Sequence, residues 1–360
     1  MSETTEHAPA PPGPVSFWEA FRYWLKLGFI SFGGPAGQIS LMHQELVERR
    51  RWISEQRFMH ALNYTMVLPG PEAQQLAIYI GWLMHGTWGG IVAGTLFVLP
   101  SLFILMALTW IYLIYSEIPA VAGILYGIKP AVTAIIIFAA YRIGSRALRN
   151  NLLRIIAILA FVAIFVFDLP FPYIVLSAGL IGYTGAHFMP DKFQIGKHAI
   201  DSSHSYGPAV IDNNTPVPEH ARFKWSRFIV FALTGLSSWF AIMSLLAVQF
   251  DWDGTLTQMG WFFTKAALMT FGGAYAVLPY VYQGGVEHYA WLSAAQMIDG
   301  LALGETTPGP LIMIVAFVGF VGGWTKALFG ADLLYLAGIA GAMIATLFRF
   351  LPSFIFILLG

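Results

Sequence analysis

Long apolar runs dominate the chain, and three of them are long enough to cross the roughly 30 Å hydrocarbon core of a membrane as ordinary helices. These runs are Gly89–Tyr115, Val121–Tyr141 and Trp225–Phe250. Two shorter runs, Leu152–Phe167 and Pro170–Phe188, predict a tight helical hairpin because a Pro-rich break separates them. The pattern predicts an all-α polytopic membrane protein.

Other apolar runs are too short to span a membrane, and they stop at glycine and proline. Phe17–Phe32 ends at a Gly-Gly-Pro motif, and Phe58–Leu68 ends at a Pro-Gly-Pro motif that is followed by a new run, Ala73–Met84. Irregular backbone at membrane depth is tolerated only where protein or a water-filled cavity satisfies its polar groups. We therefore expect these segments to form broken or re-entrant helices.

The second half of the chain repeats these motifs. Phe-Gly-Gly at 32–34 recurs at 271–273, an offset of 239 residues, and Pro-Gly-Pro recurs at the same offset. An ungapped alignment of residues 26–71 with 265–310 contains 13 identities in 46 positions. A Leu-Pro-Ser motif beginning at Leu99 also returns at Leu351. The sequence thus predicts two copies of one broken-helix unit.

Basic residues distinguish the two copies. Four arginines surround Trp52 in the first copy, and the equivalent stretch of the second copy, 287–296, has no Lys or Arg. Positive residues favour the cytoplasmic side, so the matching loops are expected on opposite sides of the membrane. The two copies are therefore predicted to be inverted-topology repeats. The arginines are Arg49, Arg50, Arg51 and Arg57.

Composition shifts divide the chain into four parts. We expect a disordered N-terminal tail at 1–16, a first repeat half at 17–188, a polar cytoplasmic linker at 189–222 and an inverted second half at 223–360. The first half continues for about 70 residues beyond its Leu-Pro-Ser helix, whereas the sequence stops within the corresponding helix of the second half. We therefore expect the second half to be C-terminally truncated.

Composition also excludes several classes of function. The chain is 57% hydrophobic and 11% charged, against roughly 25% charged residues in soluble domains. Its net charge of +0 gives no reason to expect a nucleic-acid partner, and the absence of cysteine excludes disulfides and thiolate metal sites. No phosphate loop, nucleophile–base arrangement or metal cluster is recognisable. We expect no enzyme activity, no cofactor and no metal.

Broken helices can bind anions. The second piece of an interrupted helix begins with unpaired N–H groups and the positive end of the helix dipole. Gly34 and Pro69 are separated by the same 35 residues as Gly273 and Pro308, so two breaks per copy could bring four helix N-termini to one midplane site. The alternative is that the breaks only kink packed helices.

Charged side chains near the breaks add candidates. Lys26 and Lys265 match between the copies and lie in apolar runs, where a buried cation would complete an oxyanion site; snorkelling to the surface is the alternative. Glu72 follows the first Pro-Gly-Pro and Glu305 precedes the second. Carboxylates within a membrane suggest proton coupling, although Glu72 could instead cap its helix.

The candidate substrate-binding residues are these two lysines together with the break motifs and the neutral polar groups beside them. Packing between helices explains some of the polar groups equally well. The full set is Lys26, Phe32, Gly33, Gly34, Gln38, Asn63, Pro69, Gly70, Pro71, Gln74, Gln75, Lys265, Phe271, Gly272, Gly273, Thr306, Thr307, Pro308, Gly309 and Pro310.

Four of these segments resemble a known family. FGGPAGQI at 32–39, VLPGPEAQQLAIYIGW at 67–82, FGGAYAVLP at 271–279 and ETTPGPLIM at 305–313 are similar to the motifs of the chromate transporter (CHR) family, in its long two-domain form. The resemblance implies a multi-pass protein of the bacterial plasma (inner) membrane that exports chromate, driven by the proton-motive force, and so confers chromate resistance.

The resemblance also implies the partners of the chain. They are chromate or sulfate, which is a close structural mimic, together with protons and the lipid bilayer; a homodimer is left open. The resemblance places the functional core at the Phe-Gly-Gly and Pro-Gly-Pro motifs. Two alternatives remain at this stage, a passive oxyanion channel and an exporter of another small solute.

Overall fold

The fold is almost entirely helical in a computed structural model of the chain. The model describes residues 12–32, 34–148, 150–167, 169–189, 206–216, 218–271 and 274–359. Within these ranges one isolated β-bridge, Ile53 to Ile211, accompanies the helices, so the predicted all-α class is confirmed. Most of the expected N-terminal tail lies outside the described residues, and so do 190–205 of the linker and the candidates Gly33, Gly272 and Gly273.

The first half contains the broken helices expected from its glycines and prolines. Serine caps begin two of them, since Ser16 accepts a hydrogen bond from the Glu19 N–H and Ser54 accepts one from the Arg57 N–H. Non-helical backbone at His85 interrupts the longest helix. The elements are α1 (Phe17–Ile30), α2 (Gly34–His43), the π-helix η1 (Gln44–Arg49), α3 (Glu55–Val67), α4 (Glu72–Tyr115), α5 (Pro119–Ala147), α6 (Asn151–Phe165) and α7 (Phe171–Phe188).

The second half follows a related order with shorter pieces after its breaks. A capping box joins Ser293 and Gln296 at the start of one helix. The elements are η2 (Glu219–Ala221), α9 (Trp225–Phe250), α10 (Thr255–Leu268), η3 (Ala274–Val277), α11 (Leu278–Tyr282), the π-helix η4 (Gln283–His288), α12 (Ala294–Thr306), η5 (Leu311–Met313), α13 (Ile314–Thr325), η6 (Ala331–Leu333) and α14 (Leu334–Leu359).

Three helical segments of the described chain are long and apolar enough to cross a membrane: α4, α9 and residues 331–359. The outer surface of α9 is strongly apolar, and Val248 on it is 83% exposed. Exposing such a surface to water is unfavourable, whereas hydrocarbon accommodates it. The expectation of several membrane-length helices is therefore confirmed.

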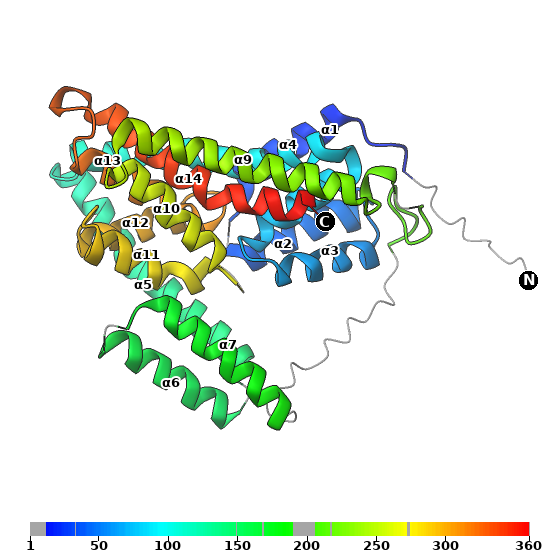
Figure 1. The fold of residues 1–360 in the computed structure, drawn as a ribbon, viewed down its shortest axis with the longest axis horizontal. Helices are drawn as coiled ribbons and strands as arrows, with labels where there is room; N and C mark the ends of the chain where they lie inside the picture. The colour runs from blue at the N-terminus through cyan, green and yellow to red at the C-terminus, as the bar shows by residue number, and fades with distance from the viewer. Residues whose placement is uncertain are drawn as a thin grey trace, which may run out of the picture.

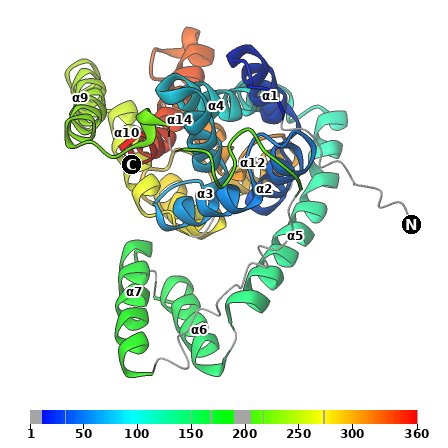
Figure 2. The same ribbon diagram turned by 90° about the vertical axis from the view of Figure 1, so that its right-hand side faces the viewer.

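The helices form one packed body with a projecting hairpin. Figure 1 shows α9 running alongside α14; α10 and α13 pack against α14, and α12 packs against α13. Helices α6 and α7 form the predicted hairpin, which lies apart from that body, and Figure 2 shows α5 leading out to it. The hairpin is tied back where the Phe171 N–H donates to the side-chain oxygen of Gln283, at 3.1 Å.

The two copies share local structure as well as sequence. The π-helices η1 and η4 occupy positions that differ by the same 239 residues as the sequence motifs. At that offset Arg51 and Ala290 both adopt a positive φ, of 51° and 48°, and Ser54 and Ser293 both cap the next helix. Unusual backbone at equivalent positions indicates a common fold for the two segments.

The described part of the linker packs on the arginine-rich loop of the first half. The Ile211 N–H donates to the Trp52 carbonyl, and the Ser54 N–H donates to the Ile211 carbonyl, both at 3.0 Å. The Ser54 hydroxyl also donates to Asn213, at 2.7 Å. This part of the linker and the loop therefore lie at the same end of the molecule.

Candidate functional site

The breaks of each half pack against the breaks of the other half. The Gly70 N–H donates to the Thr270 carbonyl at 2.9 Å, and the Gly309 N–H donates to the Ser31 carbonyl at 2.7 Å. These two bonds are equivalent under the 239-residue offset, so each Pro-Gly-Pro motif contacts the residue directly before the Phe-Gly-Gly motif of the opposite copy. A reciprocal exchange of this kind is the pattern that a pseudo-two-fold axis produces.

The Leu-Pro-Ser segment of each half packs against the Pro-Gly-Pro break of the other half. A Cβ placed on Gly70 would lie 2.6 Å from the Ser353 hydroxyl, and one placed on Gly309 would lie 2.7 Å from the Ser101 hydroxyl. The two glycines have φ of 137° and 110°, a region that L-residues rarely adopt. Both the space and the backbone conformation therefore require glycine at these two positions.

Buried glutamines lie around the place where each Pro-Gly-Pro motif contacts the opposite half, which we call the crossing. The Gln38 side chain of α2 donates to the Gly309 carbonyl at 2.6 Å, and the Gln75 side chain of α4 donates to the Pro69 carbonyl at 2.8 Å. Gln74 is fully buried, and neither its amide nitrogen nor its oxygen has a hydrogen-bond partner among the described residues. Three of the predicted polar residues are thus buried in or directly beside the breaks.

The helices that follow the breaks differ between the halves. In the first half α2 begins at Gly34 and α4 begins at Glu72, directly after the break motifs. In the second half, short 3₁₀ turns, η3 and η5, come first. The sequence led us to expect four helix N-termini, and the described residues supply two α-helical starts, both from the first half.

Other candidates are exposed, or their polar groups are bonded within their own helix. Phe32 and Phe271 are 52% and 49% exposed, and Asn63 is exposed as well. The hydroxyls of Thr306 and Thr307 return hydrogen bonds to carbonyls of their own helix, α12. These two threonines complete the end of α12.

The lysine pair does not meet at the breaks. Lys26 is exposed, and Lys265 is partly buried with its Nζ 5.7 Å from the centre of the Trp261 ring. Lys265 lines an open cavity of about 730 Å³ together with Tyr280 and Glu287, and no residue of either Pro-Gly-Pro motif lines it.

The two candidate carboxylates flank the Pro-Gly-Pro motifs. Glu72 is the first residue of α4 and is only 9% exposed. Glu305 lies in the last turn of α12, where its carboxylate accepts a hydrogen bond of 2.9 Å from the Tyr275 hydroxyl. One carboxylate therefore follows the first break, and the other precedes the second.

Sequence reasoning missed an ion pair that holds α5 to the body, formed by the half-exposed Lys129 and the buried Asp299. The Lys129 Nζ lies 2.8 Å from one carboxylate oxygen of Asp299, and the Tyr112 hydroxyl donates to the other oxygen at 3.0 Å. Both charges interrupt apolar helices, so each was recognisable as an unusual intramembrane residue. Their pairing was not recognisable, because 170 residues separate them in the chain.

Sequence reasoning also missed Arg349, in the middle of α14. Its side chain is fully buried, and none of its three guanidinium nitrogens has a hydrogen-bond partner within the part of the chain that the structure describes. It is the sole charged residue of the apolar run Leu334–Leu359, which was a usable signal. The Leu-Pro-Ser motifs place Phe97 at the equivalent position of the first half.

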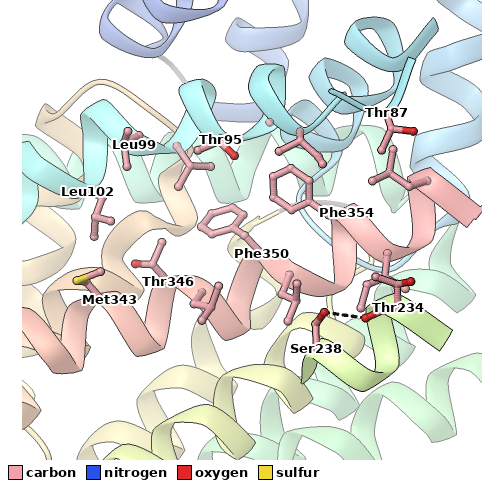
Figure 3. A pocket seen from close by; sticks show the side chains of 18 of the residues that line it. Thr87, Thr95, Leu99, Leu102, Thr234, Ser238, Met343, Thr346, Phe350 and Phe354 are labelled. Atoms are coloured by element: carbon pink, nitrogen blue, oxygen red, sulfur yellow. Dashed lines mark hydrogen bonds between the residues drawn. The ribbon is translucent and has the colours of Figure 1, made fainter. Parts of the chain in front are cut away.

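A large groove lies between α4, α9 and α14. It encloses about 660 Å³ and is lined mainly by apolar side chains such as Leu99, Phe350 and Phe354 (Figure 3). Among its polar groups the Ser238 hydroxyl is already occupied by a hydrogen bond to the Thr234 carbonyl. An apolar groove of this kind suits hydrocarbon and not an oxyanion, whose desolvation it would not compensate.

The arginines of the loop at 49–57 set the charge state of the acidic side chain beside them. Arg49 and Arg50 donate hydrogen bonds of 3.0 and 3.2 Å to the Glu45 carboxylate. Partial burial raises the pKa of Glu45, but these bonds and the positive charges outweigh it and hold that pKa below its ordinary value. The Arg57 side chain donates to backbone carbonyls of the linker instead.

Comparison with known proteins assigns the family. The family model described as "Chromate transporter" matches residues 18–183 and 257–360. The chain is 32% identical over 360 residues to a chromate transport protein of Pseudomonas aeruginosa, covering 99% of this chain and 74% of the relative. It is 30% identical over 338 residues to a chromate transport protein of Cupriavidus metallidurans, covering 94% of this chain and 72% of the relative. A probable chromate transport protein of Synechococcus elongatus is 30% identical over 335 residues, covering 93% of this chain and 73% of the relative.

No solved structure matches the chain. The family model and these relatives nevertheless agree, and both extend across the two halves and their break motifs. The chain belongs to the chromate transporter family, whose members are multi-pass membrane transporters and not enzymes.

Proposed function

We propose that the chain is a secondary active transporter that exports chromate across a bacterial plasma membrane, with sulfate as a related ligand. The observation that carries the proposal is the reciprocal pair of hydrogen bonds, Gly70 to Thr270 and Gly309 to Ser31. The exchange brings the broken helices of both halves to one place. Inverted-repeat transporters bind their substrates at such a junction near the bilayer midplane.

The oxyanion binds at this junction, among the break motifs. The starts of α2 and α4 offer backbone N–H groups and the positive ends of two helix dipoles. The amides of Gln38, Gln74 and Gln75 supply neutral hydrogen-bond donors in a buried setting. Family membership and the chromate-transport names of the relatives support chromate as the substrate.

Glu72 and Glu305 couple transport to protons. A carboxylate beside the binding site repels an oxyanion while it is ionised and stops repelling it once protonated. Proton binding and anion binding therefore favour each other, so the proton and the oxyanion cross together. A dianion that carries one proton keeps a net negative charge, and the inside-negative membrane potential drives that charge outward. Along the chain, Glu72 directly follows the first Pro-Gly-Pro motif and Glu305 precedes the second, so each half supplies one of the two carboxylates.

The two halves have opposite orientations in the membrane. The arginine-rich loop at 49–57 and the described part of the linker lie together, which fits a shared cytoplasmic side. The equivalent loop of the second half, 287–296, contains no Lys or Arg and lies on the other side. We divide the chain at the linker 189–222, with the first half at 17–188 and the inverted half at 223–360.

Transport of radiolabelled chromate by purified protein in proteoliposomes tests the proposal. We expect accumulation against the chromate gradient when a pH gradient is imposed, loss of accumulation with a protonophore, and competition by sulfate. Rapid flux that ignores the pH gradient would indicate a passive oxyanion channel. Absence of chromate flux in vesicles that retain folded protein would indicate another solute, and either result would overturn the proposal.

A further inference from the structure

Helix α14 carries a charge that the described part of the chain does not neutralise. Arg349 is fully buried, and Nε and both terminal nitrogens lack hydrogen-bond partners among the described residues. No carboxylate in that part of the chain lies within 4.0 Å of these nitrogens. Taking an arginine out of water is unfavourable unless an opposite charge or good acceptors compensate it. A buried guanidinium of this kind is a functional-site candidate within a membrane protein.

Arg349 lies one helical turn along α14 from Ser353, the residue that reaches the first Pro-Gly-Pro break. Ser353 follows it by four residues, so the two side chains share a face of α14 and their Cα atoms are about 6 Å apart along the axis. The Ser353 hydroxyl lies beside Gly70, as the space around that glycine shows. It has no hydrogen-bond partner in the described chain either.

Unpartnered buried polar atoms are concentrated in the segments that flank the two Pro-Gly-Pro breaks and in α14. Folded proteins pair the large majority of their buried polar atoms, so a concentration of exceptions indicates a ligand. Nine of the fourteen such side-chain atoms found in the described residues belong to the first turn of α4 and to the Leu-Pro-Ser regions of α4 and α14. The residues are Gln74, Gln75, Ser101, Thr346, Arg349 and Ser353.

We propose that Arg349 is the cation that binds the tetrahedral oxyanion, with the Ser353 hydroxyl as a neighbouring neutral donor. The inference rests on the proposed function and specifies its charged group. A guanidinium presents parallel N–H groups that match two oxygens of a tetrahedral oxyanion, and a hydroxyl can donate to a third. The exposed Lys26 and the partly buried Lys265 offer neither the burial nor the position of Arg349.

The equivalent position of the first half makes the site asymmetric. Phe97 occupies it and is fully buried in the apolar core. Among the described residues, only the first of the two equivalent breaks has a fully buried cation near it, which predicts one oxyanion bound per chain. The symmetry also supplies a matched comparison, because Ser101 lies against Gly309 as Ser353 lies against Gly70.

Thermal unfolding of the purified full chain in detergent tests the inference, with chromate, sulfate and chloride as added anions. Wild type should be stabilised by chromate and sulfate and not by chloride at equal ionic strength. The R349M variant should melt at a higher temperature than wild type without anion, because an uncompensated buried charge is gone. It should also lose the chromate-dependent shift.

Two further variants sharpen the test. R349K keeps the charge but loses the planar fork, and chromate affinity should fall about ten- to a hundredfold. S353A removes one hydroxyl and should weaken chromate binding by up to about tenfold. S101A removes the equivalent hydroxyl beside the break that has no arginine. It should weaken chromate binding less than S353A does.

Several outcomes would overturn the inference. If R349M keeps the full chromate-dependent shift in melting temperature, Arg349 does not bind the oxyanion, although the proposed function would still stand. Marked destabilisation of R349M without anion would assign the arginine a structural partner within the protein. Equal losses for S353A and S101A would contradict the asymmetric site. If wild type neither responds to nor transports any oxyanion, the proposed function itself fails.

Discussion

Replacing Gly309 by alanine tests the crossing of the two halves directly. Alanine would have to adopt a φ of 110°, and strained backbone of this kind costs about 1–3 kcal/mol. Its Cβ would also lie 2.7 Å from the Ser101 hydroxyl and against the Ser101 Cβ, which cannot rotate away. Overpacking of this kind costs about 1–3 kcal/mol more. We expect G309A to lose about 2–6 kcal/mol of stability.

Three other glycines separate the two contributions. Gly86 has a φ of 64° with nothing within 4 Å of an added Cβ, so G86A measures the backbone strain alone. Gly300 has no positive φ, but its Cβ would collide with the Phe317 ring, so G300A measures overpacking alone. Gly179 has neither problem, and G179A should be neutral or stabilising by up to about 1 kcal/mol.

Reversible unfolding in mixed detergent micelles, followed by circular dichroism, ranks these variants. G309A and its equivalent G70A should be the least stable of the series. The reasoning is refuted if G309A is no less stable than G86A, because the close approach of Ser101 would then be absent. It is equally refuted if G309A matches G179A.

The remaining predictions concern charges. E72Q and E305Q should abolish the dependence of chromate flux on a pH gradient while chromate exchange without a gradient persists, whereas E117Q, at an exposed site between α4 and α5, should behave as wild type in the same vesicles. D299N should destabilise the protein by about 1 kcal/mol because it removes the charge that pairs with the half-exposed Lys129, and K129M should cost less in the D299N background than in wild type; additive effects would refute the pairing. Because the pKa of Glu45 is lowered in the folded state, its stabilising effect is present above the ordinary carboxyl pKa and is lost as pH falls through the lowered value. E45Q should therefore melt below wild type at about pH 7, and melting curves should converge towards about pH 3; a constant gap would contradict the assignment.

Local features of the fold were predictable from the sequence. The span Trp225–Phe250 matches α9 residue for residue, because a continuous apolar run fixes a helix between polar ends. The breaks fell at glycine and proline, since these residues carry their backbone preferences with them. The 239-residue register, which was read from the sequence, relates positions that share unusual backbone in the structure, such as Arg51 and Ala290.

Long-range arrangements were not predictable in the same way. Nothing local in the sequence indicates that Gly70 bonds to Thr270, or that Asp299 pairs with Lys129, because such contacts depend on how distant helices pack. Arg349 was overlooked for a different reason. The two candidate lysines are matched between the copies, whereas the counterpart of Arg349 is Phe97. A charge without a symmetric partner needs to be judged by its apolar surroundings.

The central claim is that two halves of opposite orientation bring their broken helices to one site. The chain contains no cysteine, so a single introduced cysteine is a unique label. Gln56 and Ala295 are exposed, equivalent positions near the starts of α3 and α12. Labelling of Q56C and A295C by a membrane-impermeant maleimide, in oriented vesicles, should occur from opposite sides of the membrane. Labelling of both variants from the same side would contradict the account.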